Sequence, residues 1–437
     1  MMTQHLWAFP ISVNSRAFAA IFLSLTVWFA ATAVARGEDW PQFRGPTGMG
    51  LSTERDLPRE WDASGKNVVW KVPLPGVAPQ AKADQNQSSP IVWHDRVFVT
   101  TAFWPSGRSQ KEPPDQHVAC YAVADGRMLW DTLIPRGPWK LDDLRGGYCA
   151  PTPATDGERV YVLFGSAVLS ALDFAGHIVW RRELPDPQSF DVAIAPSPIL
   201  FNNQILLLTD KNNGKSVLTA YDPADGHTLW EHKRPDTVYA HSTPVIVEHE
   251  GRALLLAAAH EALQALDPAT GEILWWSATP GDVASPVYDK GRIYLDSGRG
   301  GPGLLVVPTA RGELPKTDVK WRIANLPEGL SSPVISGEYL YRLHNPGVLK
   351  CFSLADGKEA FAKRLDGVSV ASSPIVTPDG ILYFASAGRT FVVRAGPQFD
   401  LLATDDLGEP SSASAAVGNG RIYLKGREHL FCIGGKR

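Results

Sequence analysis

The chain has 437 residues, with 42 Lys and Arg residues against 46 Asp and Glu residues, and a formal net charge of −4. This charge supplies no basic surface for DNA, RNA or an anionic bilayer, so nucleic acid is excluded as the expected partner. Hydrophobic residues make up 44% of the chain, and its 39 glycines, 35 prolines and 14 tryptophans indicate a globular protein with many turns and recurring large apolar anchors.

The first 35 residues have the composition of a targeting segment. After Arg16, residues 17–33 are almost entirely apolar, and Ala33-Val34-Ala35 places small residues at a cleavage position. An uncleaved membrane anchor is the alternative, but the stretch is short for a span and ends in a cleavage-like site. No cysteine lies nearby to carry a lipid. We therefore expect a signal peptide over residues 1–35, and a soluble, exported mature protein in the periplasm or outside the cell.

An internal repeat organises the rest of the chain. Each unit reads Ser-Pro, two apolar residues, a turn, Arg-Val-Tyr-Val, a loop, Ala-Leu-Asp, a glycine turn and a Trp four residues after the glycine. The units open at Pro90, Pro153, Pro198, Pro244, Pro286, Pro333 and Pro374, with Ala415 in the eighth position. After the first unit the spacing is 41 to 47 residues, the length of one four-stranded propeller blade. The pattern predicts an all-β, eight-bladed β-propeller of antiparallel blades.

The pattern within a unit predicts four strands, A to D. Strand A is short and apolar, strand B alternates around an aromatic, strand C carries Ala-Leu-Asp, and strand D ends at the Trp. The glycine between strands C and D indicates a hairpin turn with positive φ. We expect the recurring tryptophans, such as Trp180 and Trp230, to pack between blades rather than to form a stacking platform for sugars or quinones.

The ends of the chain predict how the ring closes. The eighth unit stops after strand C, at Leu430-Phe431-Cys432, whereas residues 67–70 form an unassigned strand of type D ahead of the first unit. Pairing these two segments would complete the last blade and remove exposed sheet edges. We therefore expect the propeller to span residues 67–434, preceded by a leader, residues 36–66, which Trp40 and Phe43 hold on its surface.

The repeat resembles a known family. Its Ala-Leu-Asp and glycine-Trp units look like PQQ-like (pyrroloquinoline-quinone-type) repeats, and the opening Asp39-Trp40-Pro41-Gln42-Phe43-Arg44-Gly45-Pro46 resembles the leader of exported bacterial propellers of that kind. Two groups of relatives bracket the functions that the resemblance implies. Quinoprotein alcohol dehydrogenases hold PQQ and Ca²⁺ in the central funnel beside a disulfide of adjacent cysteines, and the BamB-like outer-membrane assembly lipoprotein is a scaffold without catalysis.

The chain departs from both groups. None of its four cysteines are adjacent, and no lipidated cysteine follows the signal segment. Cys120, Cys351 and Cys432 occupy equivalent positions in different repeats, too far apart to pair, so we expect them to be buried and unpaired. Cys149 has no partner that the sequence identifies.

Three strings imitate functional motifs and fail. Gly214-Lys215-Ser216 lacks the first glycine of a phosphate loop because Thr209 stands there. A string resembling a zinc-protease helix has Gln264 in place of its second His, and a string resembling a calcium loop has Tyr221 at its last ligand position. We therefore predict no catalytic residues and no metal ligands.

The loops on one face give a better candidate region. In a four-stranded blade the D-to-A and B-to-C connections lie on the same face and surround the funnel, where rigid scaffolds place function. The polar residues of these connections are Arg145, Tyr148, Asp191, Lys211, Tyr239, His241, His260, Asp296, Arg299, Arg342, His344 and Arg389. They predict either a solvated rim or a site for a polar or anionic ligand, with Arg299, His241 and Arg342 foremost because Arg binds carboxylate and phosphate bidentately.

The leading functional hypothesis is a monomeric, non-catalytic envelope protein that binds a protein partner or a small polar ligand and needs no cofactor. The alternative is a PQQ-dependent dehydrogenase of alcohols or sugars with Ca²⁺. A carbohydrate-related hydrolase or lyase on the same scaffold is a third possibility that the sequence leaves open.

Overall fold

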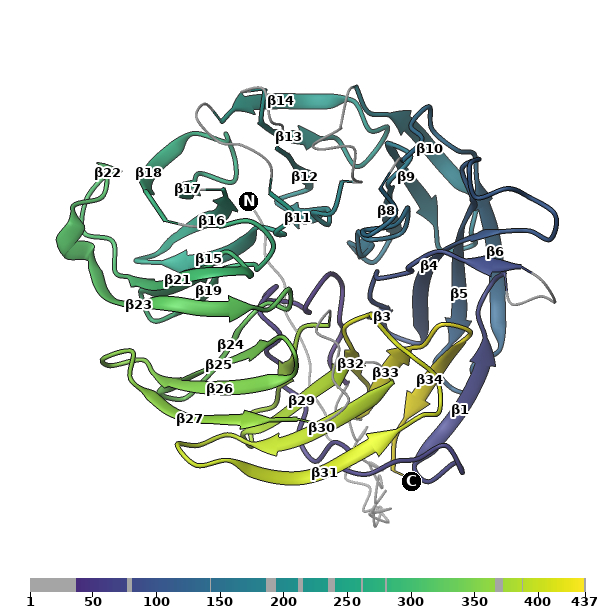
Figure 1. Cartoon of the computed structure of the whole chain (residues 1–437). Coiled ribbons are helices and arrows are strands. Elements are labelled where there is room, and N and C mark those ends of the chain that lie inside the picture. The colour runs from purple at the N-terminus through teal and green to yellow at the C-terminus, as the bar shows by residue number, and fades with distance from the viewer. Residues whose placement is uncertain are drawn as a thin grey trace, which may run out of the picture. The chain divides into compact units, whose positions relative to one another are not determined.

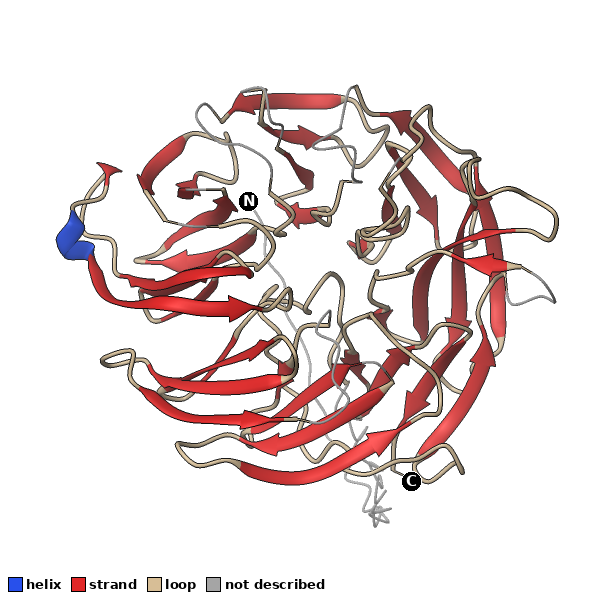
Figure 2. Ribbon diagram, in the orientation of Figure 1, coloured by secondary structure: helices blue, strands red, loops and turns tan. Residues whose placement is uncertain are grey.

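The repeat forms eight antiparallel sheets arranged around a common centre (Figures 1 and 2). The computed structural model describes residues 37–76, 81–141, 143–185, 194–210, 215–234, 240–260, 262–279, 281–365, 372–386 and 388–435. The predicted signal peptide, residues 1–35, lies outside these ranges. Within them, no helix has both the length and the apolar character that crossing a membrane requires.

Blades 1 to 4 follow the predicted order of strands. Blade 1 contains β2 (Lys82–Ala83), β3 (Ile91–Trp93), β4 (Arg96–Trp104), β5 (Asp115–Ala122) and β6 (Met128–Ile134). Blade 2 contains β7 (Ala154–Thr155), β8 (Arg159–Phe164), β9 (Val168–Asp173) and β10 (Ile178–Glu183). Blade 3 contains β11 (Ile199–Phe201), β12 (Gln204–Thr209), β13 (Val217–Tyr221) and β14 (Thr228–Lys233). Blade 4 contains β15 (Val245–His249), β16 (Arg252–Ala259), β17 (Ala262–Leu266) and β18 (Ile273–Ser277).

Blades 5 to 8 repeat this order with two departures. Blade 5 contains β19 (Val287–Asp289), β20 (Arg292–Asp296), β21 (Arg299–Val306) and β23 (Val319–Glu328). Blade 6 contains β24 (Val334–Ser336), β25 (Tyr339–His344), β26 (Val348–Ser353) and β27 (Glu359–Arg364). Blade 7 contains β28 (Ile375–Val376), β29 (Ile381–Ser386), β30 (Arg389–Arg394) and β31 (Asp400–Asp406). Blade 8 contains β32 (Ala416–Gly418), β33 (Arg421–Lys425), β34 (His429–Ile433) and β1 (Val68–Pro73).

The first departure is the insertion in blade 5. Between β21 and β23 the chain forms β22 (Gly312–Glu313) and the short 3₁₀ helix η1 (Lys316–Asp318). β22 pairs in parallel with β18, so the insertion adds an outer strand to blade 4. This cover protects part of one exposed sheet edge.

The second departure closes the ring as predicted. β1, from the start of the propeller, pairs antiparallel with β34, and Lys71 lies opposite Phe431 (Figure 1). The first strand therefore serves as strand D of the last blade, and the sheet that would otherwise end open at β34 is complete.

At five of the eight seams between neighbouring blades, a Trp packs on a glycine turn of the next blade. The indole N–H of Trp180 donates to the carbonyl of Pro223 in blade 3 at 2.9 Å, and a Cβ added at Gly226 would lie 2.7 Å from the Trp180 ring. The same contact joins Trp70 to Gly126, Trp130 to Gly176, Trp230 to Gly271 and Trp321 to Gly357. The glycine is required twice, because φ is positive there (+74° at Gly226) and because the Trp leaves no room for a side chain.

One detail of the sequence interpretation was wrong. Strand D was expected to end at the Trp, but the Trp is its third residue, as Trp180 is in β10. The ladder between strands C and D shifts register just before Trp180 and continues to Glu183. The interblade packing of the tryptophans is confirmed.

The leader lies across the inner strands of several blades. Trp40 is fully buried and exchanges backbone hydrogen bonds with Val92 of β3, at 2.8 and 2.9 Å. Farther along, the Ser52 N–H donates to the carbonyl of Val376 in β28 at 2.9 Å. Both contacts fall at the second residue of a strand A, so the leader packs along the innermost strands of blades 1 and 7. Trp40 holds the leader as predicted, whereas Phe43 lines the pocket described below.

All four cysteines are buried and unpaired, as expected for Cys120, Cys351 and Cys432. Cys149 lies in the connection between blades 1 and 2, where its Sγ is 3.3 Å from the Ser88 hydroxyl.

Candidate functional site

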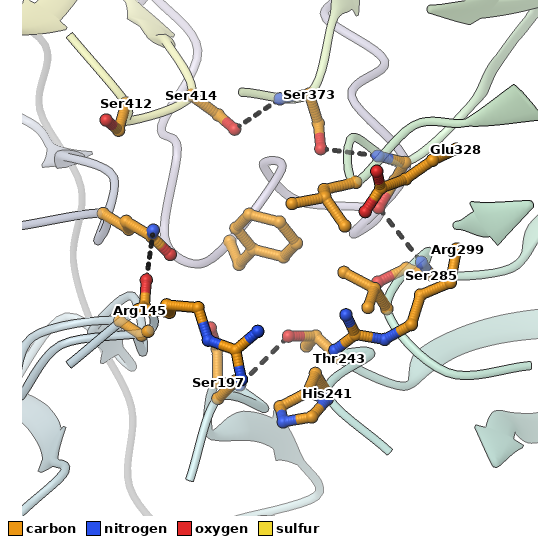
Figure 3. A pocket seen from close by; sticks show the side chains of 18 residues that line it. Arg145, Ser197, His241, Thr243, Ser285, Arg299, Glu328, Ser373, Ser412 and Ser414 are labelled. Atoms are coloured by element: carbon orange, nitrogen blue, oxygen red, sulfur yellow. Dashed lines mark hydrogen bonds between the residues drawn. The ribbon is translucent and has the colours of Figure 1, made fainter. Parts of the chain in front are cut away.

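A cavity of about 330 Å³ opens at the centre of the ring, on the side of the D-to-A loops (Figure 3). The connections that lead into strand A of all eight blades contribute to it, together with Arg299 of β21 and Phe43 of the leader. Its ionisable lining residues are Arg145, His241, Arg299 and Glu328. The cavity has the size of a pocket for a small ligand, and it lies where the rigid strands position loops for binding.

A single buried carboxylate orients two of these residues. Asp282 accepts a hydrogen bond from the Arg299 Nε at 2.5 Å, and its other oxygen lies 3.0 Å from the His241 Nδ1. The backbone N–H groups of His241 and Ser242 donate to the Asp282 carbonyl, at 2.7 and 2.9 Å. Only 2% of the Asp282 side chain is exposed, whereas 48% of the Arg299 side chain is exposed. Asp282 thus fixes the base of Arg299 and leaves the guanidinium accessible from the pocket.

Arg145 reaches the pocket from the opposite side, in the connection between blades 1 and 2. Its guanidinium forms a bidentate pair with Asp143, with Nε 3.1 Å from Oδ1 and Nη2 2.5 Å from Oδ2, and its side chain is 84% exposed. The hydrogen bond and charge of Asp143 raise the pKa of Arg145, and those of Arg145 lower the pKa of Asp143. A pair so exposed contributes little to stability, so Arg145 is free to reorient toward a ligand.

Three of the predicted site residues form a buried cluster instead of lining this pocket. Arg342 donates to both oxygens of Asp296, at 2.8 and 2.7 Å, and to the backbone carbonyls of Gly329 and Ser331. Burial alone would raise the pKa of Asp296, but the charge and hydrogen bonds of Arg342 outweigh it and hold that pKa below its ordinary value. The pair joins β20 of blade 5 to β25 of blade 6, and its placement is that of an interblade contact.

His344 belongs to the same cluster. Its Nδ1 lies 2.9 Å from the Pro327 carbonyl, so Nδ1 carries the hydrogen, because a carbonyl only accepts. Burial, followed by the nearby charge of Arg342, lowers the pKa of His344 to about 4. The imidazole is therefore neutral at neutral pH.

The other predicted residues lie apart from the pocket. Arg389, at the start of β30, is exposed and pairs with Asp406 at 3.4 Å. Tyr148 is buried and accepts a hydrogen bond from the Leu141 N–H at 2.8 Å, and His260 does not line the pocket. Asp191, Lys211 and Tyr239 lie outside the described residues.

Sequence reasoning missed several residues that line the pocket. Glu328 carries no motif, and Phe43 was placed in the leader without a role in the site. Asp282, which orients two lining residues from behind, was missed as well. It also missed a ring of hydroxyls, although the recurring Ser-Pro at the start of each unit was a visible signal for it. Across the described residues, His, Cys, Asp and Glu side chains form no group of three that could hold a metal ion.

The repeat, the closed ring and the central pocket agree with the comparison to known families. A family model described as outer membrane protein assembly factor BamB matches residues 114–363, more than half of the chain. The chain belongs to this family of PQQ-like propellers. A search of curated proteins gave no match to this BamB-like chain.

Solved structures share the fold of this BamB-like propeller at low sequence identity. BamB from Moraxella catarrhalis is 16% identical with a TM-score of 0.56, covering 84% of this chain and 99% of its own. Quinohemoprotein alcohol dehydrogenase ADHIIG from Pseudomonas putida HK5 is 10% identical with a TM-score of 0.58, covering 91% and 81%. Quinohemoprotein alcohol dehydrogenase from Comamonas testosteroni is 13% identical with a TM-score of 0.52, covering 92% and 81%. These similarities extend to the fold alone.

Proposed function

We propose that this propeller is a non-catalytic binding module of the cell envelope whose central pocket takes a small anionic ligand. The observation that carries the proposal is the shared anchoring of Arg299 and His241 by the buried Asp282. The guanidinium is held at Nε, and within the described chain its two terminal nitrogens have no hydrogen-bond partner. A planar pair of free donors fits a carboxylate or phosphate bidentately.

The anchoring also explains why binding would be efficient. Arg299 gives up little rotamer freedom on binding because Asp282 already restrains it. Arg145, across the pocket, adds a second guanidinium whose exposed pair with Asp143 is easily exchanged for a ligand. An acidic side chain of a protein partner is an equivalent ligand for these residues, which gives the same pocket a scaffolding role.

The test compares two arginines on the same face of the molecule. We expect citrate, glucose 6-phosphate or inorganic phosphate to raise the melting temperature of the wild-type protein, because a ligand that binds the native state stabilises it. Arg299→Ala should weaken binding, measured by calorimetry, about 30-fold or more. Arg389→Ala, which removes an exposed Arg outside the pocket, should leave binding unchanged. If none of the three anions binds the wild-type protein, or if both variants bind equally, the proposal is wrong.

The fold similarity to quinohemoprotein alcohol dehydrogenases favours a second candidate, a PQQ-dependent dehydrogenase of alcohols or sugars. Calcium beside PQQ needs six to eight oxygen ligands, including carboxylates. Among the described lining residues Glu328 is the one carboxylate, and Asp282 is engaged by Arg299, so the residues present do not fit a calcium site. Adding PQQ and Ca²⁺ should therefore change neither the melting temperature nor dye reduction with alcohols or sugars, and an increase in both would establish this candidate instead.

A further inference from the structure

A ring of hydroxyl side chains surrounds the base of the central pocket. Each of the eight units places a Ser or Thr two residues before strand A, namely Ser89, Thr152, Ser197, Thr243, Ser285, Ser332, Ser373 and Ser414. All eight are buried, and the last six line the pocket. Because every blade contributes one member, the ring encloses the centre of the propeller.

Backbone hydrogen bonds join this ring from blade to blade. The N–H of one member donates to the hydroxyl oxygen of the next in six places, at 2.8 to 3.0 Å. Figure 3 shows two of these bonds, from Ser197 to Thr243 and from Ser373 to Ser414. The bonds form two arcs of four residues, and the oxygens at the start of each arc, on Ser89 and Ser285, are buried without a partner among the described residues.

This arrangement makes the ring a donor surface. A hydroxyl has one hydrogen to donate, and an oxygen that accepts a backbone N–H keeps that hydrogen free. In the described part of the chain, the ring hydroxyls that line the pocket donate to no recorded acceptor. A buried donor without an acceptor is costly, so the ring is suited to a ligand that supplies acceptors.

A buried positive charge lies directly behind the ring. Arg44 of the leader is 1% exposed and donates to the carbonyls of Met49 and Pro333, at 2.8 and 2.5 Å. Pro333 follows the ring member Ser332. The Nε and Nη1 of Arg44 have no partner among the described residues, and no carboxylate pairs with it. Burial, and then the charge of Arg342, lowers the pKa of Arg44 to about 9, so it remains charged at neutral pH.

We propose that the hydroxyl ring binds one oxyanion group, a carboxylate, phosphate or sulfate, in the central pocket, and that the buried charge of Arg44 behind Pro333 stabilises it. This inference rests on the proposed function and names the part of the ligand that lies deepest. An oxyanion supplies acceptors for the free hydroxyl hydrogens of the ring, and its charge compensates Arg44. A neutral sugar can also hydrogen-bond to the hydroxyls, but it carries no charge to compensate Arg44 and therefore fits this site less well.

The test removes one hydroxyl that the fold does not use. Ser285→Ala deletes an oxygen with no partner, so the melting temperature should not change, whereas the affinity for inorganic phosphate and sulfate should fall about tenfold or more. Ser412→Ala is the matched control, because Ser412 lines the same pocket outside the ring and its loss should not change affinity. Glucose should not bind either the wild-type protein or the variants.

The outcomes separate this inference from the proposed function. Phosphate binding that is lost in Arg299→Ala but unchanged in Ser285→Ala would overturn the ring site and leave the proposed function standing. So would binding of glucose as tight as that of phosphate. If no anion binds, both proposals are wrong.

Discussion

Two Arg–Asp pairs that lie close together in the fold have different consequences. In the seam between blades 5 and 6, Arg342 is 1% exposed, and every nitrogen of its guanidinium donates to Asp296 or to a backbone carbonyl. At the pocket, Arg299 meets an equally buried carboxylate, Asp282, through Nε and is half exposed. The two pairs differ in how many guanidinium N–H groups already have a partner. Those of Arg342 are all engaged and hold two blades together, whereas Arg299 keeps N–H groups that a ligand can use.

The largest expected effect is on the buried Arg342–Asp296 pair. Arg342→Ala leaves the Asp296 carboxylate buried without its cation, so the free energy of unfolding should fall by about 3–5 kcal/mol in urea denaturation. Arg299→Ala is the control, and it should cost less, because Arg299 is half exposed and Asp282 keeps its contact with His241. Equal losses in the two variants would erase the distinction.

His344 allows a test of the same cluster by pH. Its pKa is about 4 in the native state against about 6.5 in the unfolded chain, so the unfolded state binds the extra proton first. The stability that His344 contributes is therefore present above pH 6.5 and is lost as the pH falls to 4, by about 3 kcal/mol in all. His344→Asn keeps a donor near the Pro327 carbonyl but does not titrate, so its stability should fall less between pH 6.5 and 4 than that of the wild type. A wild-type-like slope in the variant would contradict this assignment.

A smaller effect extends the comparison from side chains to the backbone of the seams. Gly226→Ala places a methyl group 2.7 Å from the Trp180 ring at a φ of +74°, so we expect a loss of about 2 kcal/mol or more. Gly251 has a similar φ of +76° but nothing within 4 Å of an added Cβ, so Gly251→Ala should show the backbone cost alone, about 1 kcal/mol. The difference between the two melting temperatures measures the Trp contact.

The fold could be predicted from the sequence because the same pattern of strand and turn residues recurs in eight units. Unit spacing gave the number of blades, and the spare strand at residue 68 gave the closure with residue 433. The seams were predicted only in part. The glycine was assigned correctly to its turn, but its contact with the Trp of the preceding blade was not predicted, because that contact depends on how neighbouring sheets stack.

The pocket was predicted less well, for a physical reason. Loop polarity identified Arg299 and His241, but it ranked Arg342 with them and also named Asp296 and His344, although these three are buried at the seam. The exposure of each arginine, and the number of its N–H groups that already have a partner, depend on packing between blades. The sequence of a single unit does not determine that packing. The partner of Arg299, Asp282, precedes it by 17 residues in a loop without a motif, so its role became visible only in three dimensions.

The pairing of β1 with β34 also has a consequence for the order in which the molecule is assembled. The strand that emerges earliest from synthesis finds its neighbour only after the final unit has been made, some 360 positions later in the chain. Such a distant contact is slow to form, and an unpaired strand is prone to join other chains in the meantime. Residues 68–73 therefore need protection until the last unit has been synthesised, because the open edge of β34 is covered only when the ring closes.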